Sequence, residues 1–351
     1  MSIKERFQKL LDKVGSGKTL FEDESAFVFD CMMSGIATPA QMGGILLALR
    51  ARGETVDELI GGVRAMRNRA IKVMAPLGAV DTAGTGGDAS GTFNISTASA
   101  IVVAASGIVV AKHGNRALTS KSGSADILAE LGVNIDAEVS IVERCLTHVG
   151  IGFMMAPLYH KAMKNVAPTR LELGTRTIFN LLGPLSNPAD AKFQLVGVYD
   201  SKWAEPMAEV LNKLGSKRVW IVHGSDGLDE ITTTGPTEVV ELNDGVIKRF
   251  SLSPEDVGFS RSELSDLKGG SSAENAQLMK GLLAGKKDPI RDIVLLNAGA
   301  MIFIGGGVES LRDGVNLAIE SIDSGKAKDK LDALINVSNS SRKIISEKHS
   351  I

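Results

Sequence analysis

The sequence predicts an α/β protein with a small all-helical lobe and a larger α/β lobe, whose mainly parallel central sheet is covered by helices. Three observations support this. The first 70 or so residues carry helical patterns only, and from residue 78 short β-branched runs alternate with helical stretches. A chain of 351 residues is also long for one hydrophobic core.

The helical lobe is expected to span residues 1–72. The opening stretch MSIKERFQKLLDKV has the apolar spacing of an amphipathic helix. In a later helix Thr38 is the expected N-cap, Pro39 the first helical residue and Gly53 the stop. The pair Thr55 and Glu58 has the spacing of a capping box.

The α/β lobe is expected to comprise residues 78–160 and 191–351. Its strand candidates are short runs that end in glycine or polar residues: GAVDTAG, GIVVAKHGN, QLVGVYD and RVWIVHG. Helical stretches such as SADILAELGVNI and SKWAEPMAEVLNKLG lie between them. Ligands of such sheets bind beyond the carboxyl ends of the strands, where these glycine turns fall.

The segment 161–190 interrupts this alternation. It has a helical period and is closed by Gly-Pro and Asn-Pro pairs. We expect it to pack back on the helical lobe, with hinges near 72–78 and 188–192.

Composition narrows the function classes. The formal net charge of -2 argues against a general nucleic-acid-binding surface. Two isolated cysteines favour a reducing, cytoplasmic setting over a disulfide framework. The longest apolar run, residues 100–111, is too short to span a bilayer, so a soluble protein is expected.

The stretch GTGGDASGTFNIST, residues 84–97, is the first candidate site. A purely structural glycine turn is one interpretation. A dinucleotide site is disfavoured, because no acidic residue occurs from Ala89 through Ala125 to bind the ribose. A Walker loop is disfavoured as well, because no Gly-Lys-Ser/Thr triplet follows the turn.

The lack of acids in this region supports an anion site instead. Glycines let an oxyanion approach the main chain, and Asn94, Ser96 and Thr97 stand where a helix would begin, with its free N–H groups. The loop that follows is rich in hydroxyls and contains Lys112 and Arg116. These cations could be ordinary solvated charges, but their crowding favours phosphate or pyrophosphate as the ligand.

An acidic cluster follows a later strand. The stretch HGSDGLDEITTTGP places Asp226, Asp229 and Glu230 within five residues. A solvated turn is one interpretation, and a Mg²⁺ site that shares the ion with ligand phosphates is the other.

Four motifs resemble the signature blocks of the anthranilate phosphoribosyltransferases: DTAGTGGDASGTFNIST, AKHGNRALTSKSGSAD, APTRLELGTRTIFNLLGPLSNPA and HGSDGLDEITTTGPT. The resemblance extends to about residue 340. It implies a homodimer that joins anthranilate to 5-phosphoribosyl diphosphate (PRPP) and releases pyrophosphate, in tryptophan biosynthesis. It also implies Mg²⁺ as cofactor, with two ions per monomer when PRPP is bound.

The resemblance implies roles for particular residues, none of them a general acid or base. Anthranilate would meet Gly84, Asn115 and Arg170, and Mg²⁺ would be held by Ser96, Asp229 and Glu230. The implied PRPP ligands are Gly84, Gly87, Asp88, Thr92, Asn94, Ile95, Ser96, Thr97, Lys112, His113, Gly114, Asn115, Arg116, Ala117, Leu118, Thr119, Ser120 and Ser124. Arg170 could also be a surface charge or part of a salt bridge between the lobes.

Three alternatives stay open. A pyrimidine nucleoside phosphorylase shares the lobes but would be expected to carry an extra C-terminal domain. A silent regulatory homologue should lack some of the metal or cation positions. A relative acting on another aromatic acid is the third. One departure from the family pattern, the glycine-rich stretch 305–307, bears on packing rather than on chemistry.

Overall fold

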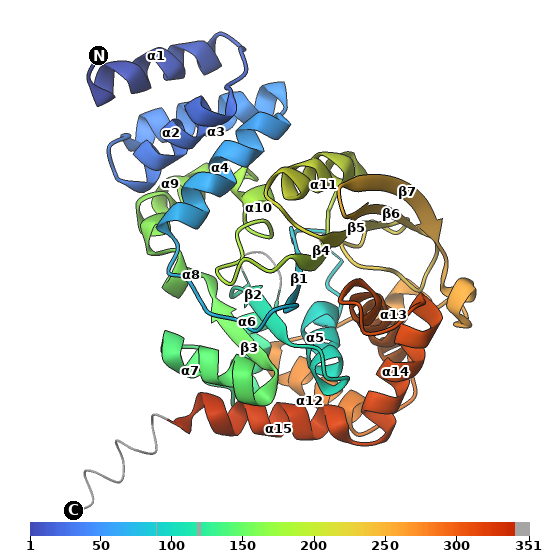
Figure 1. The fold of residues 1–351 in the computed structure, drawn as a ribbon. Coiled ribbons are helices and arrows are strands. Elements are labelled where there is room, and N and C mark those ends of the chain that lie inside the picture. Colours follow the sequence, from blue (N-terminus) through green and yellow to red (C-terminus); the bar gives the residue numbers. More distant parts are fainter. Residues whose placement is uncertain (89, 118–120, 341–351) are drawn as a thin grey trace, which may run out of the picture.

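The computed structural model describes residues 1–88, 90–117 and 121–340 and has the predicted α/β architecture. A bundle of four helices forms the N-terminal end of the molecule, beside a helix-covered sheet (Figure 1). These four helices are α1 (Ile3–Gly15), α2 (Glu22–Met33), α3 (Pro39–Arg52) and α4 (Val56–Arg69). Thr38 and Thr55 cap α3 and α4 as the sequence predicts, each in a capping box.

The sheet has seven strands in the order β3-β2-β1-β4-β5-β6-β7. The five strands from β3 to β5 pair in parallel, whereas β6 and β7 add an antiparallel hairpin at one edge. The strands are β1 (Val80–Gly84), β2 (Val110–Gly114), β3 (Ile151–Met155), β4 (Phe193–Gly197), β5 (Arg218–Gly224), β6 (Thr237–Asn243) and β7 (Val246–Leu252). The predicted mainly parallel sheet is confirmed, and the hairpin is an addition to it.

Longer helices cover the sheet between and after the strands (Figure 1). They are α5 (Ile95–Ala105), α6 (Ser124–Glu130), α7 (Val139–Arg144), α11 (Ala204–Lys213), α12 (Ser272–Leu283), α13 (Pro289–Ile304), α14 (Leu311–Asp323) and α15 (Lys326–Ser338). Single helical turns occur at Cys145–Val149, Ser201–Trp203, Pro254–Val257 and Leu264–Leu267.

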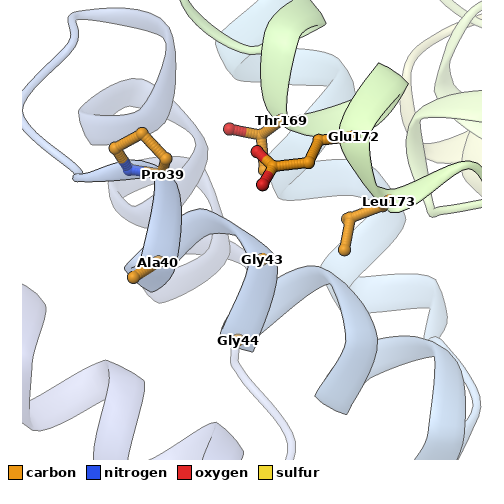
Figure 2. Close-up of a pocket in the computed structure, with 7 residues that line it drawn as sticks. All are labelled: Pro39, Ala40, Gly43, Gly44, Thr169, Glu172 and Leu173. Atoms are coloured by element: carbon orange, nitrogen blue, oxygen red, sulfur yellow. The ribbon is translucent and has the colours of Figure 1, made fainter.

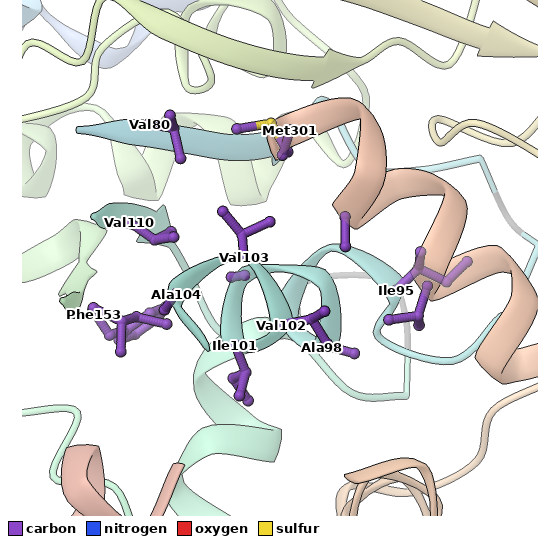
Figure 3. Packing of buried hydrophobic residues seen from close by; sticks show 14 of the residues in the cluster. Val80, Ile95, Ala98, Ile101, Val102, Val103, Ala104, Val110, Phe153 and Met301 are labelled. Carbon is purple, nitrogen blue, oxygen red and sulfur yellow. The ribbon is translucent and has the colours of Figure 1, made fainter. Parts of the chain in front are cut away.

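The central helix α5 packs against the parallel half of the sheet. Every residue from Ala98 to Ala104 is buried, and all but Ser99 are apolar, so this helix lies inside the core. Figure 3 shows Val103 and Ala104 on the side of α5 that faces Val80 and Val110 of the neighbouring strands. The C-terminal turn of α5 thus packs against the first residues of β1 and β2.

The two faces of the sheet belong to different hydrophobic clusters. Leu195, Trp220 and Val239 pack with α5 and the C-terminal helices. Their neighbours along the strands, Val196, Ile221 and Val240, pack with α11 and the N-terminal helices. The alternation follows from the period of two residues in a strand, and it gives the helical bundle a shared core with one sheet face.

The segment 161–190 contributes to that same core. It contains α9 (Ala167–Leu173) and α10 (Phe179–Leu182), preceded by α8 (Ala156–Tyr159) and a short helix Lys161–Asn165. Val166, Ile178 and Phe179 are buried among residues of the N-terminal helices, and the ring of Phe179 meets that of Phe29 edge-on at 5.4 Å. The division into lobes at 72–78 and 188–192 stays a prediction.

Both cysteines are buried and unbonded. None of the helices in the described part of the chain combines the length and apolar composition needed to cross a bilayer.

Candidate active site

The candidate site lies where the strand order of the parallel sheet reverses, between β1 and β4. In open α/β sheets this reversal leaves a crevice beyond the carboxyl ends of the strands. The ends of these strands, Gly84 and Gly197, are paired neighbours. A Cβ on either glycine would collide with Asp229. Two glycines side by side therefore let the acidic turn lie directly over the strand ends.

The acidic turn bonds to both predicted anion-binding elements. Asp229 Oδ2 accepts a hydrogen bond from the Gly86 N–H at 2.8 Å. Glu230 Oε1 accepts one from the Ser96 N–H, in the first turn of α5, at 3.2 Å. The structure thus brings the glycine turn, the start of α5 and the acids together, as the sequence predicts from their strand-end positions.

Burial disfavours the ionised form of the acidic side chains. Burial raises the pKa of Asp229 to about 6, and the nearby Asp88 carboxylate adds to the shift. Burial and the Asp229 charge raise the pKa of Glu230 well above its usual range. Like charges in a desolvated site favour uptake of a proton or a cation.

Lys112 is the buried cation of the site. Its Nζ donates to the Thr82 carbonyl at 2.7 Å and lies 3.4 Å from Ser96 Oγ. Burial lowers the pKa of Lys112, and the charges of Asp81 and Glu230 oppose that shift. A lysine in the middle of β2 therefore faces the acids and the start of α5 at once.

Asn94 ties the glycine turn to the neighbouring loop. Its Nδ2 donates to the Ser122 carbonyl at 3.1 Å, and its Oδ1 accepts from Asn275 Nδ2 at 2.9 Å. Asn275 lies on α12 and is 1% exposed. Behind the turn, Thr92 pairs with Lys268 in an isolated bridge.

The cationic loop is stabilised by a carboxylate immediately beyond the acid-free stretch. Asp126 accepts hydrogen bonds from the Ala117 and Gly123 N–H groups and pairs with Arg116 at 3.0 Å. Asn115 Oδ1 accepts from the Arg116 N–H at 2.8 Å. The predicted ligands Leu118, Thr119 and Ser120 lie outside the described residues.

The other predicted phosphate ligands line the same strand ends. Ile95 and Thr97 belong to the first turn of α5, and the buried Thr97 Oγ1 has no partner within the described residues. Gly114 ends β2 and leaves no room for a Cβ against Phe153 and Ser124, the first residue of α6.

Two buried histidines lie beneath the loop. The His113 and His160 rings are 5.1 Å apart, and in the described structure neither Nε2 has a partner. Burial lowers the pKa of His113 to about 3 and that of His160 to about 4, so both rings are neutral at neutral pH. The backbone N–H of His113 donates to the Asp81 carboxylate, which also accepts from Asn187 Nδ2.

Arg170 lies on α9, apart from the phosphate residues. Its guanidinium carbon is 5.4 Å from the centre of the Phe179 ring. Its pKa is lowered, and burial is the one cause, so no carboxylate of the described chain lies close enough to offset it. A salt bridge between the lobes is not what this structure shows.

A separate pocket of about 470 Å³ lies between α3 and α9 (Figure 2). Its lining includes Gly43, Thr169 and Leu173 but none of the predicted phosphate ligands. The pocket belongs to the helical face of the molecule, so it is not the candidate active site.

Sequence reasoning missed Gly197, His160 and Asn275. Gly197 had a signal, because a glycine inside the strand candidate QLVGVYD can mark a close approach of another backbone. His160 and Asn275 had no signal, because no local sequence pattern marks them and only the fold brings them next to the site.

The fold and site define a class of glycosyl transferases. The model of the glycosyl transferase family helical bundle domain matches residues 8–70, and that of the a/b domain matches residues 77–328. Together the two models cover most of the chain.

Relatives specify the family further. The chain is 58% identical to an anthranilate phosphoribosyltransferase of Azorhizobium caulinodans, over 94% of this chain and 96% of the relative. It is 56% identical to that of Rhodospirillum rubrum, over 93% and 94% of the two chains. This chain belongs to the anthranilate phosphoribosyltransferase family.

Solved structures agree. The Thermus thermophilus anthranilate phosphoribosyltransferase superposes with a TM-score of 0.89 at 43% identity, covering 94% of this chain and 99% of that one. The Saccharomyces cerevisiae enzyme in complex with PRPP and Mg gives a TM-score of 0.87 at 30% identity, covering 95% and 98%.

The buried histidines predict a specific loss of stability in acid. Because the folded-state pKa values lie below the ordinary 6.5, the stability is fully present above pH 6.5 and falls as pH drops towards 4. Each histidine contributes a slope of about 1.4 kcal/mol per pH unit in that window. The variant His160→Phe should lose one such contribution, as measured by urea unfolding from pH 7 to 5.

The difference between variant and wild type is the quantity to compare. Asp81, whose pKa burial raises to about 6, acts in the opposite direction over the same window in both proteins. His148 has an exposed side chain, so His148→Gln is the matched control and should leave the profile unchanged. Parallel profiles for His160→Phe and wild type would contradict the assignment.

Proposed function

We propose that this protein catalyses the reaction of its family: transfer of the 5-phosphoribosyl group from PRPP to the amine of anthranilate, in tryptophan biosynthesis. The products are N-(5-phosphoribosyl)anthranilate and pyrophosphate. The single observation that carries the proposal is the acidic turn over the paired glycines Gly84 and Gly197, bonded to the start of α5. This arrangement places carboxylates, a buried lysine and helix N–H groups at one edge of the sheet.

The proposed PRPP site uses the two strand-end loops. The N–H groups of the glycine turn and of the first turn of α5 would donate hydrogen bonds to the diphosphate oxygens. Lys112 would supply a fixed positive charge beneath them, and Asn94 would hold the two loops in register. The proposed PRPP ligands are those residues from the sequence analysis that lie at these strand ends.

The residues present suit Mg²⁺. Asp229 and Glu230 are adjacent and partly buried. Burial and the Asp88 charge raise the pKa of Asp229, and burial and the Asp229 charge raise that of Glu230, so a cation would relieve their charge. Within the described residues no group of three or more His, Cys, Asp or Glu forms a ready cage for a metal. Mg²⁺ commonly takes one or two carboxylates and completes its shell with phosphate and water.

We therefore propose Ser96, Asp229 and Glu230 as the Mg²⁺ ligands, with two ions per protomer. The third carboxylate at the site, Asp88, supports the second ion, because it lies close enough to Asp229 to raise the pKa of that group. When bound, Mg²⁺ would neutralise negative charge on the diphosphate oxygens.

The protein's own residues would act mainly by position and charge. The amine of anthranilate is a weak nucleophile, so departure of pyrophosphate is the difficult part of the reaction. Donors at Gly86, Ser96 and Lys112 would face the oxygens on which charge develops. Holding the two substrates in reacting geometry can contribute about 7–11 kcal/mol in well-oriented systems.

A general base is not part of the proposal. His113 is the histidine closest in sequence to Lys112, and burial lowers its pKa to about 3. A group so weakly basic would take a proton poorly at neutral pH. Its backbone, which donates to Asp81, fits a structural role.

Arg170 is the proposed anchor for the anthranilate carboxylate, with Gly84 and Asn115 nearby in the bound state. Arg170 is half-buried and has no carboxylate partner in the described structure, and burial lowers its pKa, so a ligand carboxylate would stabilise its charge. A guanidinium can grip a carboxylate through two parallel hydrogen bonds.

We also propose that the protein is a homodimer and that its helical end forms the interface. Ile3, Ile36, Leu47 and Leu171 are exposed apolar side chains on or beside these helices. Two grooves flank the first turns of α3, one bordered by Phe7 and Ile36 and the other shown in Figure 2. A second copy would cover apolar surface that otherwise faces water.

The reaction is tested by the fluorescence of anthranilate. Mixing the protein with PRPP and Mg²⁺ should consume that fluorescence and release pyrophosphate, and EDTA should stop both. Asp229→Asn combined with Glu230→Gln should lower kcat by about a hundredfold or more, because charge on the leaving group loses its neutralisation. Circular dichroism checks that the fold is kept.

The matched control changes two exposed acids, Asp136→Asn with Glu138→Gln, and should keep wild-type kcat. Turnover unaffected by EDTA, or a fully active Asp229 and Glu230 variant, would remove metal and acids from the reaction.

The anthranilate anchor is tested by Arg170→Ala. Loss of a charged hydrogen-bond pair should raise the KM for anthranilate about 10- to 100-fold and change the KM for PRPP little. Arg64→Ala removes a half-exposed arginine of the N-terminal bundle and serves as the control. A rise confined to the KM for PRPP would assign Arg170 to the other substrate.

The homodimer is tested by sedimentation equilibrium. The expected mass is twice the 37.0 kDa of the chain. Ile36→Glu should shift the protein towards monomer, because a charge would enter the apolar face. Leu77→Glu, at a fully exposed position of the linker before β1, should not. A wild-type protein that sediments as a monomer would refute the proposal.

A further inference from the structure

Arg176 extends from the segment 161–190, here called the helical insert, to the glycine turn of the site. It lies between α9 and α10, and its Nη2 donates a hydrogen bond to the Gly87 carbonyl. Its guanidinium carbon lies 3.8 Å from the centre of the Tyr199 ring, in cation–π geometry. The roles implied by the family resemblance do not include this residue.

The helical side of this contact is itself anchored. Arg50, on α3, donates to the Arg176 carbonyl at 2.8 Å and also to the Thr175 hydroxyl. The backbone that carries Arg176 is therefore tied to the N-terminal bundle, 126 residues away in sequence. A displacement of α3 would be transmitted to the guanidinium through these bonds.

The receiving side is fitted to the contact. Gly87 has φ +76°, and a Cβ there would lie 2.7 Å from Arg176 Nη2, so a side chain would both strain the backbone and displace the arginine. Tyr199 follows β4, and its N–H donates to Thr85 Oγ1 at 3.0 Å. The same turn is thus held at Thr85 by the β4 end and at Gly87 by the helical insert.

This contact determines the direction of a peptide group. In a trans peptide the C=O of one residue and the N–H of the next point in opposite directions. Fixing the Gly87 carbonyl on Arg176 therefore turns the Asp88 N–H to the opposite side of the loop. One residue earlier, the Gly86 N–H is bonded to Asp229.

We propose that Arg176 is a positioning residue for the diphosphate-binding turn: it fixes the Gly87–Asp88 peptide and couples the helical bundle to the site. The inference rests on the proposed function for what the turn binds. Tyr199 is part of the same arrangement, because its ring face orients the Arg176 guanidinium.

The first test needs no substrate. Hydrogen exchange of the peptide containing the Thr85 and Gly86 amides should accelerate about tenfold in Arg176→Ala and Tyr199→Leu, because the turn loses its contact with the helical insert. Tyr199→Phe keeps the ring face and should exchange as the wild type does. Unchanged exchange in Arg176→Ala would overturn the proposal.

The second test uses steady-state kinetics. Arg176→Ala should raise the KM for PRPP about tenfold and the KM for anthranilate less than twofold, and Arg176→Lys should recover part of the loss through its retained charge. A lower melting temperature with equal rises in both KM values would mean a merely structural residue and would overturn the proposal.

The two failures are distinguishable. A wild-type protein that does not consume anthranilate and PRPP refutes the proposed function, and the exchange experiment still decides whether Arg176 holds the turn.

Discussion

The structure of the site depends on one buried positive charge, that of Lys112. A desolvated ammonium group is costly unless hydrogen bonds and opposite charges surround it. Lys112 meets this requirement with the Thr82 carbonyl, the Ser96 hydroxyl and the nearby charges of Asp81 and Glu230. Strands β1 and β2, the start of α5 and the acidic turn are therefore positioned around a single atom.

Asp81 extends this constraint to the helical insert. Its second oxygen accepts from Asn187 Nδ2, which also donates to the Ala111 carbonyl. Asn187 follows the Gly-Pro and Leu-Ser residues that close the 161–190 segment, and it is 1% exposed. Satisfying one buried carboxylate thus joins the insert to the two strands whose ends form the site.

The sequence predicted the parallel sheet and the meeting of glycine turn, cations and acids, because strand-end position determines both. It did not lead to the β6–β7 hairpin, although a signal exists. The signal is the Asp-Gly pair at 244–245, which is typical of a two-residue hairpin turn. Both residues have positive φ, as such a turn requires. Asn275 and Arg176 could not be found at all, since their contacts join residues 181 and 89 positions apart and leave no local pattern.

The acids also explain how a diphosphate could be admitted. Asp229 and Glu230 now accept the Gly86 and Ser96 N–H groups, which are the donors proposed for phosphate oxygens. Negative oxygens already occupy the positions in which the protein stabilises charge, so the turn is shaped for an anion before one arrives. Water is removed from these N–H groups during folding rather than during binding, so ligand binding requires less reorganisation. If Asp229 and Glu230 held Mg²⁺ in place of these contacts, the Gly86 and Ser96 N–H groups would be free to donate to a diphosphate, and binding of metal and diphosphate would favour each other.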